Sequence, residues 1–138
     1  AVTYLAYDAY NNPVYVRNEK DKTETVCLYG YKGKYMIAEI KNADYEEVKR
    51  LLGESTINRL TSSLTPQEND LALLNKLRQQ LPESSISTFK YIPYIGISQF
   101  TDSRGVSTYF EYDDSGRLIR EKDNYQYVIH LYDYSKNL

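Results

Sequence analysis

The sequence predicts an α+β protein in which antiparallel β-hairpins form a twisted sheet, interrupted by a helical insertion of two to three helices. Three observations support this fold class. Apolar and polar residues alternate with a period of two in segments 1–41 and 86–134, as in strands, whereas segment 44–81 changes to helical spacing. The chain also holds 16 tyrosines, against 3 phenylalanines and no tryptophan. Tyrosine favours half-exposed sheet, where the ring packs and the hydroxyl stays in water.

Residues 1–41 are predicted to form hairpins. Turn residues occupy positions 8–12, and Pro13 opens the next alternating run. The charged stretch 18–24 is expected to be a solvated hairpin tip. The strands predicted here lie at residues 2–7, 14–16, 25–31 and 35–40.

The helical insert is predicted to begin at a capping box. Asp44 and Glu47 have the spacing at which each side chain bonds the other residue's backbone N–H, and Gly53 is a natural helix stop. A short second helix is expected over residues 55–63.

The third helix carries the clearest helical pattern. Thr65 is its expected N-cap, Pro66 its first residue, and Glu68 completes a second capping box. Pro82 ends it. We expect its apolar face to pack within the chain, with a partner-binding groove as the alternative. That face consists of Leu71, Leu74, Leu77 and Leu81, with Leu73 beside it.

The two-residue period returns after the insert. Turns are predicted at 102–105 and 113–116, where Asp and Gly bound each segment. The strands predicted in this part lie at residues 88–92, 95–100, 106–112, 117–122 and 127–134.

Two segments at opposite ends of the chain follow the same template. In residues 3–11 and 108–116, Thr, Tyr, Tyr and Asp recur in register, and Asn11 falls where the second copy has Gly116. Gly116 is expected to take the left-handed conformation that closes a turn with a bulge. Asn is the non-glycine residue that best tolerates this conformation. A repeated unit of this kind indicates a stackable structural module rather than an active site.

The second copy resembles a YD repeat of the RHS (rearrangement hotspot) family. It matches the core Tyr-Asp-x-x-Gly-Arg-Leu in full, whereas the first copy has Asn in place of Gly and Asn-Pro in place of Arg-Leu. The half-unit around Asp123 also lacks its Gly. The resemblance covers residues 1–31 and 99–134, and the chain as a whole resembles the C-terminal region of large RHS-like surface proteins of Bacteroidetes-type bacteria. The repeat-motif residues are Tyr7, Asp8, Asn11, Tyr109, Tyr112, Asp113, Gly116, Arg117 and Leu118.

This resemblance implies a part of a larger bacterial protein that is secreted or at the cell surface. In that family, repeat hairpins stack into a continuous spiralling sheet, and some members are associated with carbohydrate binding. Residues 1–138 would then be a single repeat fragment, with hairpins at 1–41 and 86–134 around the insert 44–81. Its sheet edges would pair with upstream repeats of the parent chain or with a second copy.

Composition argues against several other classes. The formal net charge is −2, which gives no long-range reason to bind nucleic acid. The apolar runs are too short for membrane insertion. Cys27 is the only cysteine, so no internal disulfide can form, and we expect a buried, inert thiol. The sequence starts at Ala1 inside a strand-like pattern, which predicts a piece of a longer chain.

No constellation of residues predicts catalysis, a metal or a cofactor. The only histidine, His130, and Asp133 stand three apart on a predicted strand and so point to opposite faces. One His and one Cys cannot form a structural zinc set. The Asp residues of the turns, Asp102, Asp113 and Asp114, lack the ligand pattern of a calcium loop. Arg117 is expected to pair with an acid such as Glu111 across the strands.

We therefore expect a non-enzymatic structural or interaction module, a tyrosine-rich scaffold of the RHS type. The alternative is a carbohydrate-binding module that uses exposed tyrosine rings. An enzyme such as a glycosidase ranks third.

Overall fold

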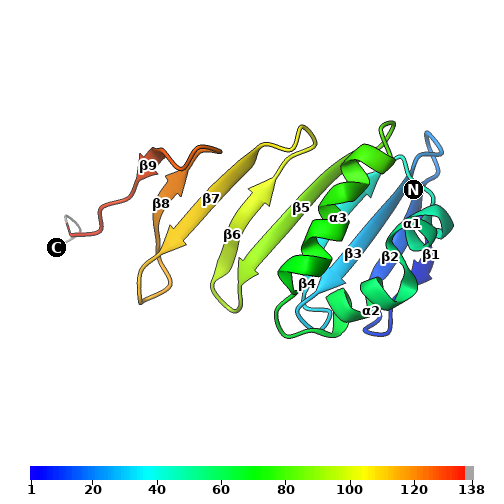
Figure 1. Ribbon diagram of the computed structural model, residues 1–138, viewed down its shortest axis with the longest axis horizontal. Coiled ribbons are helices and arrows are strands. Elements are labelled where there is room, and N and C mark those ends of the chain that lie inside the picture. The colour runs from blue at the N-terminus through cyan, green and yellow to red at the C-terminus, as the bar shows by residue number, and fades with distance from the viewer. Residues whose placement is uncertain (136–138) are drawn as a thin grey trace. The chain divides into compact units, whose positions relative to one another are not determined.

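The computed structural model of the protein describes residues 1–135 as nine strands and three helices. The order of the strands in the sheet is their order in the chain, and each pairing described is antiparallel (Figure 1). The α+β class is confirmed. The chain forms two compact units, one over Ala1–Thr88 and one from Phe89 onwards.

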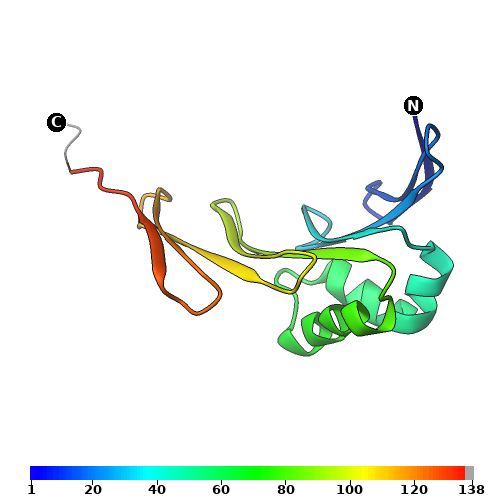
Figure 2. The same cartoon turned by 90° about the horizontal axis from the view of Figure 1, so that it is seen from above.

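The first unit contains four complete strands, the three helices and the beginning of β5. Its strands are β1 (Val2–Tyr7), β2 (Pro13–Asn18), β3 (Glu24–Gly30), β4 (Tyr35–Lys41) and β5 (Ser85–Ile92). Its helices are α1 (Tyr45–Leu52), α2 (Glu54–Ser62) and α3 (Glu68–Gln80). All three helices lie on one face of this part of the sheet (Figure 2).

The core of the first unit lies between this face and the helices. Strand β3 buries every second residue, Val26, Leu28 and Gly30, as the two-residue period predicts. The largest fully buried side chains come from both layers: Ile37, Ile40, Leu60, Leu74, Leu77, Ile86, Val26 and Val48. The insert therefore supplies the apolar surface that covers these strands.

The first two helices form where the sequence predicts them. The Asp44 side chain accepts a hydrogen bond from the Glu47 N–H at 3.2 Å, which confirms Asp44 as the N-cap of α1. Gly53, with φ 90°, ends α1 and is directly followed by α2.

The predicted start of the third helix is wrong. Helix α3 begins at Glu68 with Gln67 as its N-cap, and no side chain caps it. The residue expected at its first position, Pro66, is instead buried, and its Cγ lies 3.1 Å from the place where Gly30 would carry a β-carbon. Because the chain must first pass Pro66 against β3, Thr65 cannot serve as the cap. The apolar face is confirmed at Leu74, Leu77 and Leu81.

One buried charge links the second and third helices. The Asp70 side chain is only 5% exposed and accepts two hydrogen bonds from the Arg59 guanidinium, at 3.0 and 3.2 Å. The same guanidinium bonds the Thr56 hydroxyl at 3.2 Å. A carboxylate can be buried at low cost only when it is paired in this way.

The second unit is strands and turns alone in its described part, residues 89–135. Besides the end of β5 it holds β6 (Gly96–Thr101), β7 (Ser107–Tyr112), β8 (Leu118–Lys122) and β9 (Val128–Leu131). The residues buried here are Thr101 and Ser107, whose hydroxyls lie 2.7 Å apart. The tyrosines and aliphatic residues are half-buried or exposed. This unit thus has no helix-covered core comparable to that of the first unit.

Candidate interaction surface

Four turns within residues 1–135 are built alike, each around an aspartate. In each, the Asp Oδ1 accepts hydrogen bonds from the N–H groups two and four residues later, at 2.8 to 3.0 Å. The Asp carbonyl also accepts the N–H three residues later, at 2.9 to 3.1 Å. The four aspartates are Asp8, Asp102, Asp113 and Asp123. Each satisfies its turn's backbone N–H groups, as expected of turn-forming aspartate.

The fourth position of each turn is left-handed. Gly105 and Gly116 have φ values of 79° and 81°, and Asn11 has 65°. The conformation expected for Gly116 and Asn11 is confirmed. Gln126 takes the same conformation, with φ 72°, so the half-unit around Asp123 keeps the turn without its glycine. The hydrogen-bond pattern of the aspartate is therefore common to turns with four different sequences.

In two of the turns an arginine forms an ion pair with the turn aspartate. Arg117 Nε lies 2.9 Å from Asp113 Oδ2, and Arg104 pairs with Asp102 at 3.0 Å. The predicted pairing of Arg117 with Glu111 is wrong, because the guanidinium folds back onto its own turn. Glu111 instead bonds Arg120 and Lys122 on the neighbouring strand, each at 2.6 Å.

These contacts lower carboxyl pKa values in the second unit. Backbone N–H bonds, first those from Arg117 and Val106, hold the pKa values of Asp113 and Asp102 below the usual range. The Lys122 and Arg120 side chains lower the pKa of Glu111. A carboxyl whose folded pKa is depressed stabilises the fold above its unfolded pKa, near 4, and loses that effect as the pH falls further.

We therefore expect the melting temperature to fall between about pH 4 and pH 2 and to be insensitive to these groups above about pH 5. The variant Asp113→Asn keeps an acceptor oxygen but cannot titrate, so its melting temperature should fall less steeply with acid. Thermal unfolding followed by circular dichroism across this range measures both slopes. Equal slopes for the variant and the unchanged chain would contradict the assignment.

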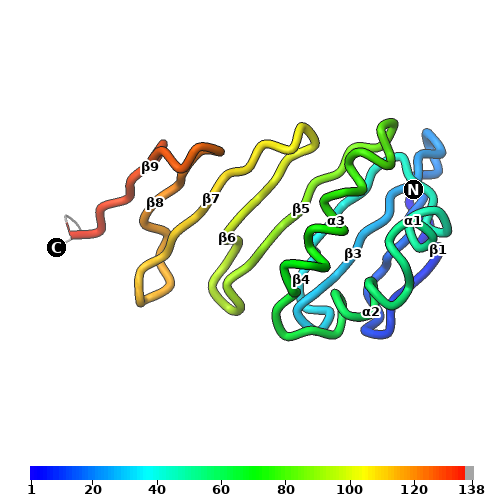
Figure 3. Tube along the Cα trace, in the orientation of Figure 1, coloured from blue at the N-terminus to red at the C-terminus, as the bar shows by residue number. Residues whose placement is uncertain are grey.

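Turns at the same end of the sheet contact each other within the second unit. The Ser107 N–H, just after the Asp102 turn, donates to Asn124 Oδ1 of the Asp123 turn at 2.8 Å. At the other end, the Arg117 guanidinium lies 4.5 Å from the centre of the Tyr134 ring. Figure 3 shows the turns of this unit at alternate ends of the strands. The Asp102 and Asp123 turns are thus joined directly, and Arg117 joins the Asp113 turn to the segment after β9.

The remaining repeat-motif residues are in strands. Tyr7 and Tyr112 are the last residues of β1 and β7, each directly before its turn aspartate, and Leu118 is the first residue of β8. Tyr109 lies in the middle of β7, opposite Gln99 and Lys122. The motif residues therefore fall into two groups, 7–11 in the first unit and 109–118 in the second, and each group builds one strand–turn unit.

One of these tyrosines is held by a close contact with glycine. The Tyr112 hydroxyl donates to the Ile97 carbonyl of β6 at 2.7 Å. A β-carbon on Gly96 would lie 2.6 Å from the same hydroxyl oxygen. We expect Gly96→Ala to displace this hydroxyl and to lower the free energy of unfolding by about 1 kcal/mol, the net value of one such hydrogen bond. Chemical denaturation measures this free energy. In the Gly96→Ala background the hydrogen bond is already lost, so adding Tyr112→Phe should lower the free energy of unfolding hardly any further.

The edge strands of the sheet, β1 and β9, are exposed and almost uncharged. Five of the six residues of β1 and all four of β9 are exposed. Tyr4 is 56% exposed and Leu131 is 70% exposed. The only ionisable groups among these ten side chains are two tyrosines and His130. Edge strands usually carry lysine or proline that prevents pairing with other chains, and these two lack them.

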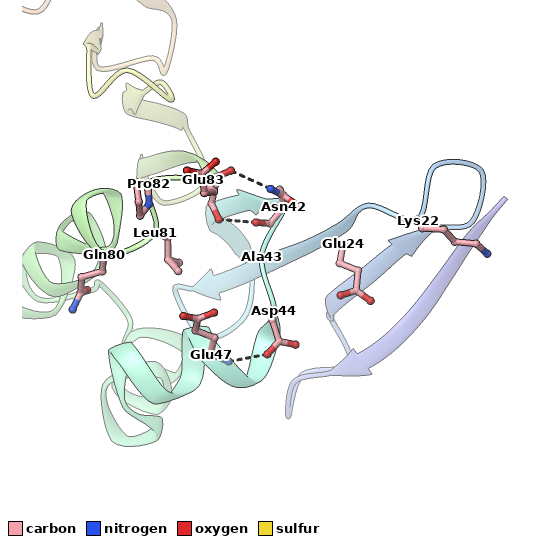
Figure 4. Close-up of a pocket in the computed structure, with 11 residues that line it drawn as sticks. Lys22, Glu24, Asn42, Ala43, Asp44, Glu47, Gln80, Leu81, Pro82 and Glu83 are labelled. Atoms are coloured by element: carbon pink, nitrogen blue, oxygen red, sulfur yellow. Dashed lines mark hydrogen bonds between the residues drawn. The ribbon is translucent and has the colours of Figure 1, made fainter.

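A separate polar pocket lies in the first unit, between the start of α1 and the end of α3 (Figure 4). Its volume is about 440 Å³. Two of its carboxylates already have structural partners: Asp44 caps α1, and Glu24 accepts hydrogen bonds from Tyr15 at 2.5 Å and Arg17 at 2.8 Å. The lining residues are Lys22, Glu24, Asn42, Ala43, Asp44, Glu47, Gln80, Leu81, Pro82, Glu83 and Ser84. The pocket is polar, and its lining residues form no arrangement of acid, base and nucleophile.

Other reactive side chains lie apart from one another. His130 Nε2 is 3.9 Å from Glu121, while Asp133 accepts hydrogen bonds from Ser135. Cys27 is half-buried rather than buried, and burial raises the pKa of its thiol to about 11. Within residues 1–135, no three His, Cys, Asp or Glu side chains gather as metal ligands would. None of the helices described there is long and apolar enough to cross a membrane.

No family model matches the chain, and no curated protein matches it either.

Three features of the structure were not predicted from the sequence. They are the equivalence of the Asp123 turn to the other three turns, the contact between the Asp102 and Asp123 turns, and the Arg59–Asp70 ion pair. The sequence did hold a signal for the Asp123 turn, because Asp123 stands ten residues after Asp113, close to the spacing of 11 between Asp102 and Asp113.

Proposed function

We propose that this chain is a non-enzymatic structural and interaction module of the RHS or YD-repeat type. Its role would be to extend a β-sheet by adding hairpins to those of a larger bacterial protein, secreted or at the cell surface. The compartment and the parent protein follow from the motif resemblance alone.

The observation that supports this proposal most is the repeated turn. Four turns share one hydrogen-bond pattern around Asp8, Asp102, Asp113 and Asp123, and the Asp102 and Asp123 turns, at the same end of the second unit, contact each other. Hairpins that repeat in this way form units that gain stability from each neighbour. The exposed, uncharged edge strands are where such a neighbour would bind.

The test compares this chain with a longer one that adds repeat hairpins next to β1. We expect the longer chain to unfold at a higher temperature and to protect β1 amides from hydrogen exchange. A matched control adds the same length of Gly-Ser linker. If both additions leave β1 exchange and the melting temperature unchanged, the sheet-extension function is wrong.

A carbohydrate-binding module is the second candidate, and one observation favours it. Tyr125 and Tyr127, in and beside the Asp123 turn, are 77% and 71% exposed, and Tyr94 is 80% exposed. Exposed aromatic rings suit stacking on apolar faces of sugar rings. A glycan array tests this candidate, with Tyr125→Ala and Tyr127→Ala as variants. The candidate requires a bound glycan whose signal falls in at least one variant.

A further inference from the structure

The two edge strands of the sheet have matching properties. Strand β1 has the sequence Val-Thr-Tyr-Leu-Ala-Tyr, and β9 has Val-Ile-His-Leu. Both faces of both strands are exposed: Tyr4 and Leu5 on β1, Ile129 and His130 on β9. Neither strand carries an acid, a lysine or an arginine, so strand pairing between them meets no like-charge repulsion.

The direction of the strands also fits. Strand β9 leads away from the Asp123 turn, which lies at the same end of the second unit as the Asp102 turn. A β1 strand placed antiparallel to β9 would lead toward that end and finish in its own Asp8 turn. The Asp8 turn would then take the next place in the row begun by Asp102 and Asp123. All three have the same hydrogen bonds.

Pairing of β1 with β9 uses both kinds of edge in a single type of contact. If β9 paired with β9 of another copy, the β1 edges would stay open, and the reverse holds for β1 with β1. A β1-to-β9 contact uses one edge from each copy, leaves the other available, and continues the chain-order antiparallel stacking that each copy already has.

We propose that two copies of this chain associate head to tail, with β1 of one copy pairing antiparallel with β9 of the other. The inference rests on the proposed sheet-extension function and names a second copy as the partner. Since one pair of strands of four to six residues makes a small interface, below about 1,200 Å², association is expected in roughly the micromolar range. A head-to-tail dimer keeps one β1 edge and one β9 edge unpaired, so assemblies should grow beyond dimers as concentration rises.

The test uses two variants of the full chain, one for each edge. Val2→Lys with Tyr4→Lys places charge on β1, and Ile129→Lys with Leu131→Lys places the same charge on β9. All four positions are exposed, so the fold should tolerate them. Tyr94→Lys with Ile95→Lys adds equal charge in an exposed turn and serves as the matched control. Circular dichroism checks that each variant is folded, and light scattering measures its mass.

The proposal predicts that the unchanged chain and the control grow beyond dimers with concentration. Each edge variant alone should be a monomer of 16.1 kDa, and an equimolar mixture of the two should form a heterodimer of about twice that mass. The mixture can form only one contact, between the unchanged β9 of one variant and the unchanged β1 of the other.

Other outcomes overturn the head-to-tail contact. A β1 variant that dimerises alone means that β9 pairs with β9, and a β9 variant that dimerises alone means that β1 pairs with β1. Either result leaves the sheet-extension function standing. An unchanged chain that stays monomeric at millimolar concentration overturns the proposal too. In that case the sheet-extension function is decided separately, by whether added hairpins stabilise the longer chain.

Discussion

Gly30→Val is expected to lower the free energy of unfolding by about 3 kcal/mol. Gly30 is buried at the end of β3, beside Leu60 of α2. A β-carbon there would lie 3.1 Å from the Leu60 carbonyl oxygen, the Ile37 Cγ2 and the Pro66 Cγ. The carbonyl belongs to helix backbone and cannot move without shifting α2. Inserting methyl groups into such a packed site costs about 1–3 kcal/mol and occasionally more.

The measurement is chemical denaturation, with Gly30→Ala as an intermediate. Alanine adds one carbon at the three 3.1 Å contacts, so its cost should be smaller than that of valine. Gly105→Ala is the matched control for packing, since nothing lies within 4 Å of a β-carbon there, although its positive φ adds a strain of its own. A cost for Gly30→Val below that of Gly105→Ala would mean that α2 does not pack on β3 as described.

The features predicted from sequence are those fixed by neighbours along the chain. The Asp44 cap involves residues three apart, and the left-handed Asn11 and Gly116 each lie in a single turn. The alternation of buried and half-buried residues in β3 follows from its sequence pattern, because one face of the strand is covered by the helices. Such local patterns are visible without knowledge of the fold.

The features that were missed depend on residues distant in sequence. Thr65 and Pro66 have a good local capping pattern, but the contact of Pro66 with Gly30 overrides it. The Arg59–Asp70 pair forms only once α2 and α3 lie together. Arg117 had two acids within reach, and spacing alone could not decide between Glu111 and Asp113. Tertiary contacts override local preference in each case.

An exchange of Gly and Gln between two turns is expected to change stability in opposite directions. Gly116 and Gln126 hold equivalent positions, with φ 81° and 72°, in turns that share one hydrogen-bond pattern. A residue with a β-carbon pays about 1–2 kcal/mol for this conformation. Gly116→Gln should therefore lower the free energy of unfolding by about 1–2 kcal/mol. Gln126→Gly should raise the free energy of unfolding by up to about 1 kcal/mol. This gain is smaller than the loss for Gly116→Gln because glycine also has more conformational freedom in the unfolded chain.

Two controls separate backbone strain from other effects of the exchange. Ser115→Gln places the same side chain one residue earlier, where φ is not positive, and should cost only a few tenths of a kcal/mol. Asn11→Gly should gain less than Gln126→Gly, because Asn tolerates the left-handed region better than Gln. Urea denaturation of the four variants measures the differences. Because the free energies depend on one shared conformation, a destabilising Gln126→Gly would show that the Asp123 turn is not equivalent to the Asp113 turn.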